Sequence, residues 1–199
     1  MPRVLSDTDV ADFRERLCEA AERLFAERGP DAVTMRQLAA ELGVSPMTPY
    51  RYFEDKEDIL AAVRTNGFTR FAEALEGARA SAEGARAVGM AVGEAYVEFA
   101  LSNPHAYKLM FDFNQPHVEN YPELVAAGRR AQKTMTDHVE DALKEGLMEG
   151  DPQQIGLMLW ASIHGAVILE LAGMLAPGGA RRLFSSFDGA LTRGLRPQD

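Results

Sequence analysis

The sequence contains few of the residues that build disulfides, metal centres or catalytic sites. It has a single cysteine, Cys18, in 199 residues, which excludes an internal disulfide and any site built from several cysteines. Its four histidines (His105, His117, His138 and His164) show no metal-ligand spacing. There is no glycine-rich phosphate loop and no Ser–His–Asp pattern in a recognisable context. We therefore expect no bound metal, no cofactor and no catalytic residue.

The chain also lacks an excess of positive charge, because 30 acidic residues outnumber 21 basic ones and give a net charge of −9. This acidity argues against nucleic-acid binding, but phosphate contact depends on local charge. Residues 43–53 contain no acidic side chain. The first residues include acids where a secretion signal has its apolar core, so we expect a cytoplasmic protein.

No alternating stretch is long enough to predict a β-strand, whereas apolar residues recur at helical intervals between glycine and proline breaks. Prolines at 104, 122 and 152 each stand at the expected first position of a helix, where the missing N–H costs nothing. The spacing predicts an all-α fold of about nine helices, at residues 7–28, 34–42, 45–52, 56–77, 85–101, 104–112, 122–149, 152–176 and 180–195.

Two of these predicted helices, 34–42 and 45–52, are separated only by Gly43 and Val44. Such a pair, joined by a short turn with glycine, is typical of a helix-turn-helix, in which the second helix presents its first residues to the major groove of DNA. Pro46 suits the first helical position, whereas Pro49 predicts a tight or 3₁₀-like first turn.

The side chains around this second helix suit a DNA groove. Hydroxyl, guanidinium and ammonium donors can reach phosphates or bases, and apolar side chains can meet thymine methyl groups. The candidate DNA-binding residues are Thr34, Arg36, Ser45, Pro46, Met47, Thr48, Tyr50, Arg51, Tyr52 and Lys56. Short helical hairpins also occur in other all-α proteins, where Tyr50 and Phe53 would be core residues, so spacing alone leaves both interpretations open.

The segment 152–176 is the most apolar part of the chain, with Glu170 as its one formal charge after Ile155. Its length permits a membrane span, but a carboxylate inside a membrane is costly, and we predict no membrane contact. A helix that is apolar on every side must be covered. We expect the last two helices to form a four-helix interface in a homodimer.

Aromatic and methionine side chains are plentiful after residue 90, as is typical of an adaptable apolar pocket. The candidate ligand-binding residues are Tyr107, Phe111, Trp160 and His164. Trp160 and His164 are one helical turn apart and therefore share a face. The same residue types at the same spacing are also typical of a packed core, and this alternative stays open.

The run AAERLFAERGPDAVTMRQLAAELGVSPMTPYRYFEDKEDILAAV (residues 20–63) resembles the N-terminal domain of the TetR family of transcriptional repressors. WASIHGAV (160–167) and NPHAYKLMF (103–111) are similar to the ligand-binding domain named WHG in one branch of that family. The resemblance implies a helix-turn-helix DNA-binding domain over residues 1–56, made of three helices, and a larger helical ligand-binding and dimerisation domain over residues 57–199.

The resemblance further implies a homodimer that binds a palindromic operator and is released by a small-molecule effector. It implies that Pro46, Met47, Thr48 and Arg51 lie nearest the bases, that Tyr50, Tyr52 and Lys56 lie on phosphates, and that Arg36 contacts backbone or base. Pro49 departs from the family pattern, which often has a large side chain there. The alternative is a helical small-molecule-binding protein, or an enzyme, that does not bind DNA.

Overall fold

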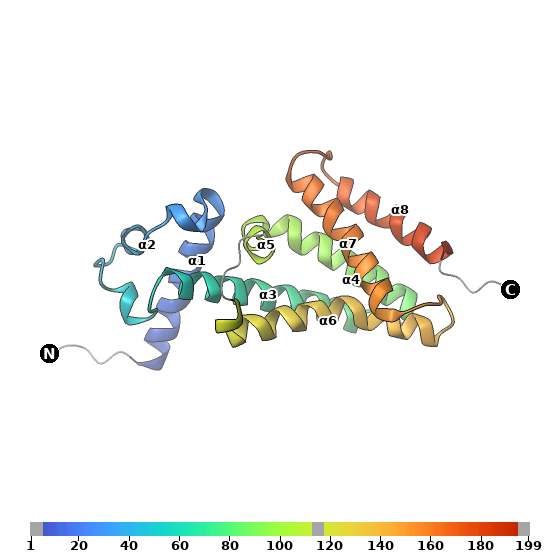
Figure 1. Cartoon of the computed structure of the whole chain (residues 1–199), viewed down its shortest axis with the longest axis horizontal. Helices are drawn as coiled ribbons and strands as arrows, with labels where there is room; N and C mark the ends of the chain where they lie inside the picture. The colour runs from blue at the N-terminus through green and yellow to red at the C-terminus, as the bar shows by residue number, and fades with distance from the viewer. Residues whose placement is uncertain (1–5, 113–117, 195–199) are drawn as a thin grey trace. The chain divides into compact units, whose positions relative to one another are not determined.

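The computed structural model describes residues 6–112 and 118–194, and the regular secondary structure of this part of the chain is all helical, without a β-strand (Figure 1). The all-α prediction is therefore confirmed. The elements in chain order are α1 (Asp7–Arg28), η1 (Pro30–Ala32), α2 (Met35–Glu41), η2 (Pro49–Arg51), α3 (Lys56–Ala80), α4 (Ala85–Ser102), α5 (Pro104–Met110), η3 (Val118–Asn120), α6 (Pro122–Lys144), α7 (Pro152–Leu171) and α8 (Gly179–Gly194), where η marks a 3₁₀-helix.

The helix starts follow the predicted capping signals. The Thr34 side chain accepts from the N–H of Gln37, whose own side chain accepts from the Thr34 N–H, so the predicted capping box of α2 is present. Prolines 104, 122 and 152 stand at the first positions of α5, α6 and α7, as expected.

Two helices end five residues earlier than predicted, and glycine explains both. α6 ends at Lys144 and not at residue 149, because Gly146 adopts φ 70°. α7 ends at Leu171 and not at residue 176, because Gly173 adopts φ 72°. In each case the glycine N–H bonds back three residues and the following N–H bonds back five, the Schellman pattern that stops a helix.

The described chain packs as two compact units. Unit 1 comprises Met1–Phe68 and His105–Ala126, and unit 2 comprises Thr69–Pro104 and Ala127–Asp199. This division follows packing alone. The boundary predicted between residues 56 and 57 concerns function and stays a prediction.

Unit 1 has its own apolar core, which joins the first two helices to the start of α3 and to α5. Leu17, Leu24 and Phe25 of α1 are fully buried against Leu38 of α2 and Ile59 of α3. The remaining members of this cluster are Cys18, Ala21, Ala26, Val33, Met35, Phe53, Val63 and Leu109. Burial raises the pKa of the Cys18 thiol to about 11, so this cysteine is an inert core residue.

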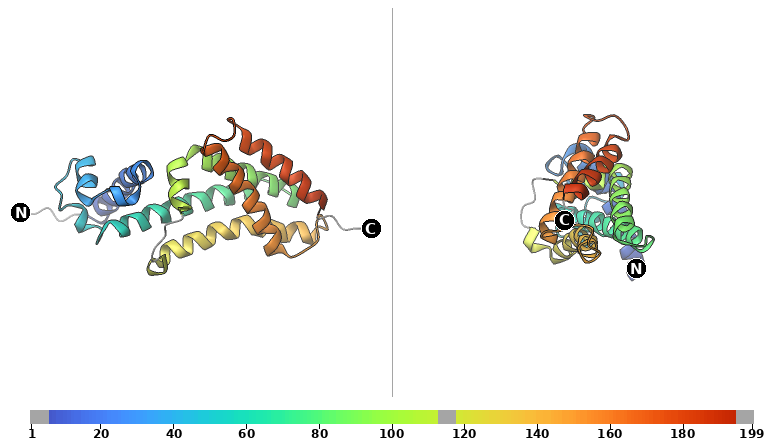
Figure 2. Two further views of the ribbon diagram at one scale, coloured as in Figure 1. Left: turned by 45° about the horizontal axis from the view of Figure 1, so that its top comes forward. Right: turned by 90° about the vertical axis from the view of Figure 1, so that its right-hand side faces the viewer.

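In unit 2, α7 and α8 lie side by side as an antiparallel hairpin (Figures 1 and 2). Glu170 secures the turn between them, because its carboxylate accepts from the N–H groups of Ala180 at 2.7 Å and Gly178 at 2.8 Å. The hydrogen bonds from the N–H groups of Ala180 and Gly178 hold the pKa of the Glu170 carboxyl below its usual value. The single charge in the apolar segment therefore caps the start of α8.

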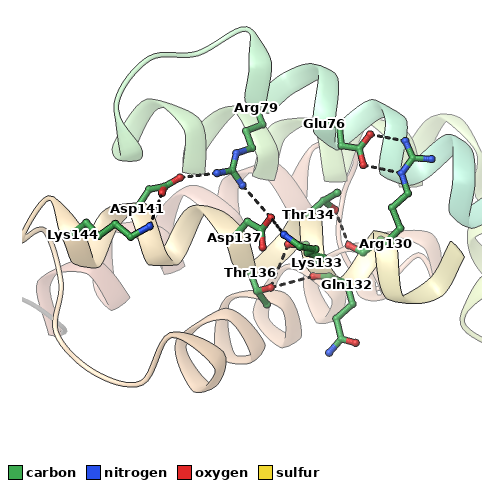
Figure 3. Close-up of polar contacts among 11 residues, drawn as sticks. Glu76, Arg79, Arg130, Gln132, Lys133, Thr134, Thr136, Asp137, Asp141 and Lys144 are labelled. Carbon is green, nitrogen blue, oxygen red and sulfur yellow. Dashed lines mark hydrogen bonds and ion pairs between the residues drawn. The ribbon is translucent and has the colours of Figure 1, made fainter. Parts of the chain in front are cut away.

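Ion pairs join the end of α3 to α6 on the surface of unit 2 (Figure 3). Arg130 binds Glu76 through two parallel bonds, of 2.8 and 2.5 Å, and Arg79 binds Asp141 at 2.7 Å. All of these side chains are more than a third exposed, so water and salt screen the attraction and each pair contributes little to stability. The apolar contacts of the unit are the larger stabilising term.

α7 is, among the described residues, the one helix whose length and composition would allow it to cross a membrane, and only 28% of its most apolar window is buried. Leu157, Met158, Ile168, Leu169 and Leu171 on this helix are exposed, as are Met174 in the following turn and Phe187 on α8. The core helices of soluble proteins pass the same test of length and composition. What the structure shows is an exposed apolar surface on α7 and α8.

The packing of Phe184 against Gly93 generates a stability prediction. A Cβ added at Gly93 of α4 would lie 1.9 Å from Cζ of Phe184 on α8. We expect Gly93→Ala to lower the free energy of unfolding by about 1–3 kcal/mol in urea denaturation, because the core must shift to admit the methyl group. Gly77→Ala is the control, since a Cβ there meets nothing within 4 Å, and it should be neutral or stabilising by up to about 1 kcal/mol. Equal effects of the two substitutions would contradict the packing described.

Candidate nucleic-acid interface

The turn after α2 is the one that the sequence predicts. Gly43 adopts φ 65°, a conformation open to glycine at little cost. Its N–H bonds to the Ala40 carbonyl at 3.1 Å, and the Val44 N–H bonds to Ala39 at 3.0 Å. α2 therefore stops at a glycine and the chain turns sharply into the recognition segment, as we name residues 45–53.

The recognition segment is not the α-helix predicted at 45–52. Most of its backbone bonds run from residue i+3 to residue i, such as Thr48 to Ser45 at 2.8 Å and Arg51 to Thr48 at 3.1 Å. Only Phe53 bonds back four residues, to Pro49 at 3.1 Å, and the regular part is the 3₁₀-turn Pro49–Arg51. Pro46 and Pro49 have no N–H to donate, and an α-helical Pro49 would crowd the carbonyl of Ser45. The predicted tight turn is confirmed, and the described chain has eight α-helices where nine were expected.

Two neighbouring residues of α1 hold the end of this segment. The Phe13 ring stacks on Tyr52 with centroids 4.3 Å apart. The Arg14 guanidinium lies 4.0 Å from the centroid of the Phe53 ring and donates to the Tyr52 carbonyl. Pro49 and Phe53 are themselves buried. A segment without a helical hydrogen-bond ladder therefore takes its position from these tertiary contacts.

The rest of the segment is open to solvent. Met47 is 68% exposed and Tyr50 is 49% exposed. Ser45, Pro46 and Arg51 are also exposed, and Thr48 is half-buried. The structure thus brings six of the predicted DNA-binding residues together on one exposed stretch that carries no acidic side chain.

The other four predicted DNA-binding residues lie beside this stretch. Thr34 and Arg36 are exposed at the start of α2, with Thr34 serving as its cap. Tyr52 and Lys56 are half-buried, since Tyr52 stacks on Phe13 and the Lys56 ammonium donates to the Pro30 carbonyl at 2.7 Å. Both therefore also hold unit 1 together, a role that sequence spacing does not reveal.

A cleft of about 590 Å³ borders the segment within unit 1, lined by Tyr50–Glu54, by Arg14, by α3 and by residues 120–124. Asp58 lies in it and accepts from the Glu54 N–H at 3.0 Å. Burial and a hydrogen bond to the Asp58 carboxylate raise the pKa of Tyr121 to about 12. Asp58 thus interacts both with Glu54, the residue that follows the recognition segment, and with Tyr121. Sequence reasoning missed both, because the contact joins residues 63 positions apart.

The four predicted ligand-binding residues form two pairs, one in each unit. In unit 1, Tyr107 is fully buried and packs on Phe111, with ring centroids 4.9 Å apart. In unit 2, the indole N–H of Trp160 donates to the Tyr96 hydroxyl at 3.2 Å, and that hydroxyl lies 3.1 Å from Nδ1 of His164. Burial lowers the pKa of His164, which favours its neutral form. Tyr96, which joins the second pair, is one of the aromatic residues that favour a pocket but is not among the four candidate ligand-binding residues.

The described residues contain no group of three His, Cys, Asp or Glu side chains able to hold a metal ion. His117, one of the four histidines considered above, lies outside the described residues.

Comparison with known proteins shows the family. Residues 17–63 match the family described as bacterial regulatory proteins, tetR family. Residues 90–193, just over half of the chain, match the family described as Tetracyclin repressor-like, C-terminal domain. The chain therefore belongs to the TetR family, whose members are DNA-binding transcriptional regulators and not enzymes.

Individual relatives agree with this assignment. An HTH-type transcriptional regulator of Staphylococcus aureus is 41% identical over 51 residues, which are 26% of this chain and 28% of that protein. The chain thus spans 28% of the length of the curated relatives it matches. A protein of unknown function from Rhodococcus sp. RHA1 is 31% identical with a TM-score of 0.82, covering 99% of this chain and 100% of its own.

Two further solved structures share the fold. A regulatory protein of the tetR family from Rhodococcus RHA1 is 22% identical with a TM-score of 0.74, over 94% of this chain and 98% of its own. The fatty acid degradation regulator FadR from Bacillus halodurans is 17% identical with a TM-score of 0.76, over 92% and 99%.

The stacking of Phe13 on Tyr52 generates a testable prediction. We expect Phe13→Ala to speed hydrogen exchange at the Tyr52 and Phe53 amides by about 5- to 30-fold, the effect of losing 1–2 kcal/mol of local contact. The Leu38 amide in α2 should exchange at its former rate, and Asp12→Ala, at an exposed neighbour, is the control. Unchanged exchange at Tyr52, or an equal increase at Leu38, would contradict the local anchoring.

Proposed function

We propose that the protein is a ligand-responsive repressor of the cytoplasm that binds a palindromic operator as a homodimer. The observation that carries this proposal is the exposed, acid-free recognition segment, anchored at one end by α1. Two such segments in a dimer enter successive major grooves when they are about 34–36 Å apart. In functional terms, residues 1–56 bind DNA and residues 57–199 bind the effector and the second subunit.

The proposed contacts with DNA follow from exposure and chemistry. Pro46, Met47, Thr48 and Arg51 contact base edges, with Met47 against a thymine methyl and Arg51 on guanine or phosphate. Thr34, Arg36, Ser45, Tyr50, Tyr52 and Lys56 contact the sugar-phosphate backbone, and Arg36 also lies near the bases. Lys56 can serve both of its roles, because its ammonium has three donors and the Pro30 carbonyl takes one.

The exposed apolar residues of α7 and α8 support the homodimer. Soluble monomers rarely expose a large continuous apolar patch, and a second copy of the same hairpin would cover this one. The four helices of two such hairpins then form the dimer interface.

The aromatic pairs support a small apolar or amphipathic effector. Tyr107 with Phe111, and Trp160 with His164, are the residues we propose to contact it. Structural relatives include regulators named for ketosteroids and for fatty acid degradation, both apolar classes of compound. We also propose that this ligand-binding domain is of the WHG branch, which residues 160–167 resemble. An effector that binds one of two states more tightly shifts operator affinity by its differential binding energy, typically 1–3 kcal/mol.

The net charge of −9 favours the alternative, a helical ligand-binding protein that does not contact DNA. A mobility-shift assay on the DNA flanking its own gene, at two salt concentrations, separates the two functions. A repressor of the proposed kind forms a complex that weakens at the higher salt concentration.

Arg51 is the residue whose loss tests DNA recognition best. We expect Arg51→Gln to weaken binding to that DNA by about 5- to 150-fold, the loss of 1–3 kcal/mol of a specific contact. Arg129→Gln, at an exposed arginine of α6, is the control and should bind as the wild type does. An Arg51 variant with unchanged affinity would contradict the proposed role of the segment.

The dimer interface generates a second prediction. Ile168→Glu combined with Met174→Glu should convert a wild-type dimer to a monomer in sedimentation at micromolar concentration, because two desolvated carboxylates oppose association. Gln132→Glu, on the exposed face of α6, should leave the dimer intact. A monomeric wild type would rule out the interface.

A further inference from the structure

Arg64, on α3 in unit 1, is buried and incompletely bonded. It is only 6% exposed, and its Nε atom has no hydrogen-bond partner among the described residues. The neighbouring Thr65, by contrast, bonds to the Ala61 carbonyl at 2.8 Å. A guanidinium group carries five donors in a fixed fork, and each donor left unpaired in the interior is costly.

The charge of Arg64 is under-compensated as well. Burial lowers the pKa of its guanidinium, and the attraction of Asp112 offsets this only in part. Buried charges in proteins are normally paired and hydrogen-bonded, because desolvation otherwise outweighs their other contacts. A further negative group beside Arg64 would therefore be stabilised.

The residues next to Arg64 along α3 pack against apolar and aromatic side chains within unit 1. Phe68 lies one turn further along the same face of α3 and meets the Phe111 ring edge-on, with centroids 5.6 Å apart. Phe111 in turn packs on Tyr107. Gly67 allows Met110 to approach so closely that an added Cβ would lie 2.9 Å from its Cγ. One buried cation thus lies on a helix face that packs against aromatic and thioether side chains.

We propose that Arg64 anchors the carboxylate of an organic acid whose apolar body packs against Phe68, Tyr107 and Phe111. A guanidinium binds a carboxylate with two parallel bonds, and a single negative charge matches the single positive one. The inference rests on the proposed function only in treating this acid as the effector. The binding itself is a property of the free protein and needs no DNA.

Paired probes test the head group. Calorimetry measures the binding of two acids, decanoate and 4-phenylbutanoate, to the full chain. The affinity of each acid is compared with that of the alcohol that has the same carbon skeleton. We expect each acid to bind about tenfold or more tightly than its alcohol, because charge-assisted hydrogen bonds contribute more than neutral ones. Decyltrimethylammonium, with the opposite charge, should not bind.

Substitution then assigns the preference to Arg64. The preference is the dissociation constant of the alcohol divided by that of the acid. In the Arg64→Gln protein the two constants should agree within about twofold. Arg16→Gln, at an exposed arginine of α1, is the control and should keep the wild-type preference. If Arg64→Gln does not fold, Arg64→Lys keeps the charge but loses the planar fork, and an intermediate ratio is expected. The comparison of acid with alcohol in the wild type needs no variant.

Three results would overturn the proposal: equal binding of acid and alcohol, no binding of either acid, or an unchanged ratio in a folded Arg64→Gln protein. Any of them would leave Arg64 as a structural partner of Asp112. None bears on DNA binding, which the mobility-shift assay with wild-type protein decides separately.

Discussion

The position of the proposed DNA-binding surface depends on the contacts of α1 with the end of the recognition segment. A helix that reads DNA is normally stiffened by its own ladder of hydrogen bonds, but two prolines remove donors from this one. Stacking of Phe13 on Tyr52 and the contacts of Arg14 with the Tyr52 carbonyl and the Phe53 ring supply the missing rigidity from outside. The other face of α1 fills the core of unit 1. The helix therefore fixes the position of Tyr52 and Phe53, which lie far from it in the sequence.

This arrangement reconciles an acidic chain with the DNA-binding surface that we propose. The prolines keep the segment short and stiff, so little conformational entropy remains to be lost on binding. Acidic side chains are absent from residues 43–53, and Glu41 just before them is paired with Arg23. The negative charge of the chain lies elsewhere, where it affects solubility and long-range steering more than groove contact.

Local signals in the sequence predict most of the fold. The capping box of α2, the glycine turn at Gly43 and the proline starts of α5, α6 and α7 are chemical features of a few adjacent residues, and each is present as expected. The prediction of an α-helix at residues 45–52 was wrong, because helical spacing was given more weight than the backbone N–H groups that Pro46 and Pro49 lack. The predicted ends of α6 and α7 were also wrong, because Gly146 and Gly173 stop the helices.

Residues of the site that depend on tertiary contact could not be predicted. The exposure of Met47, Tyr50 and Arg51 agrees with their expected role, because a short polar segment after a glycine turn lies at the surface. Asp58 meets Tyr121, and Arg64 meets the charge of Asp112, across more than 40 residues of sequence. The most direct measurement of the central claim is hydrogen exchange of the full chain with and without the DNA upstream of its gene. Slower exchange at residues 45–53 on adding DNA is predicted, and protection confined to unit 2 would contradict the account.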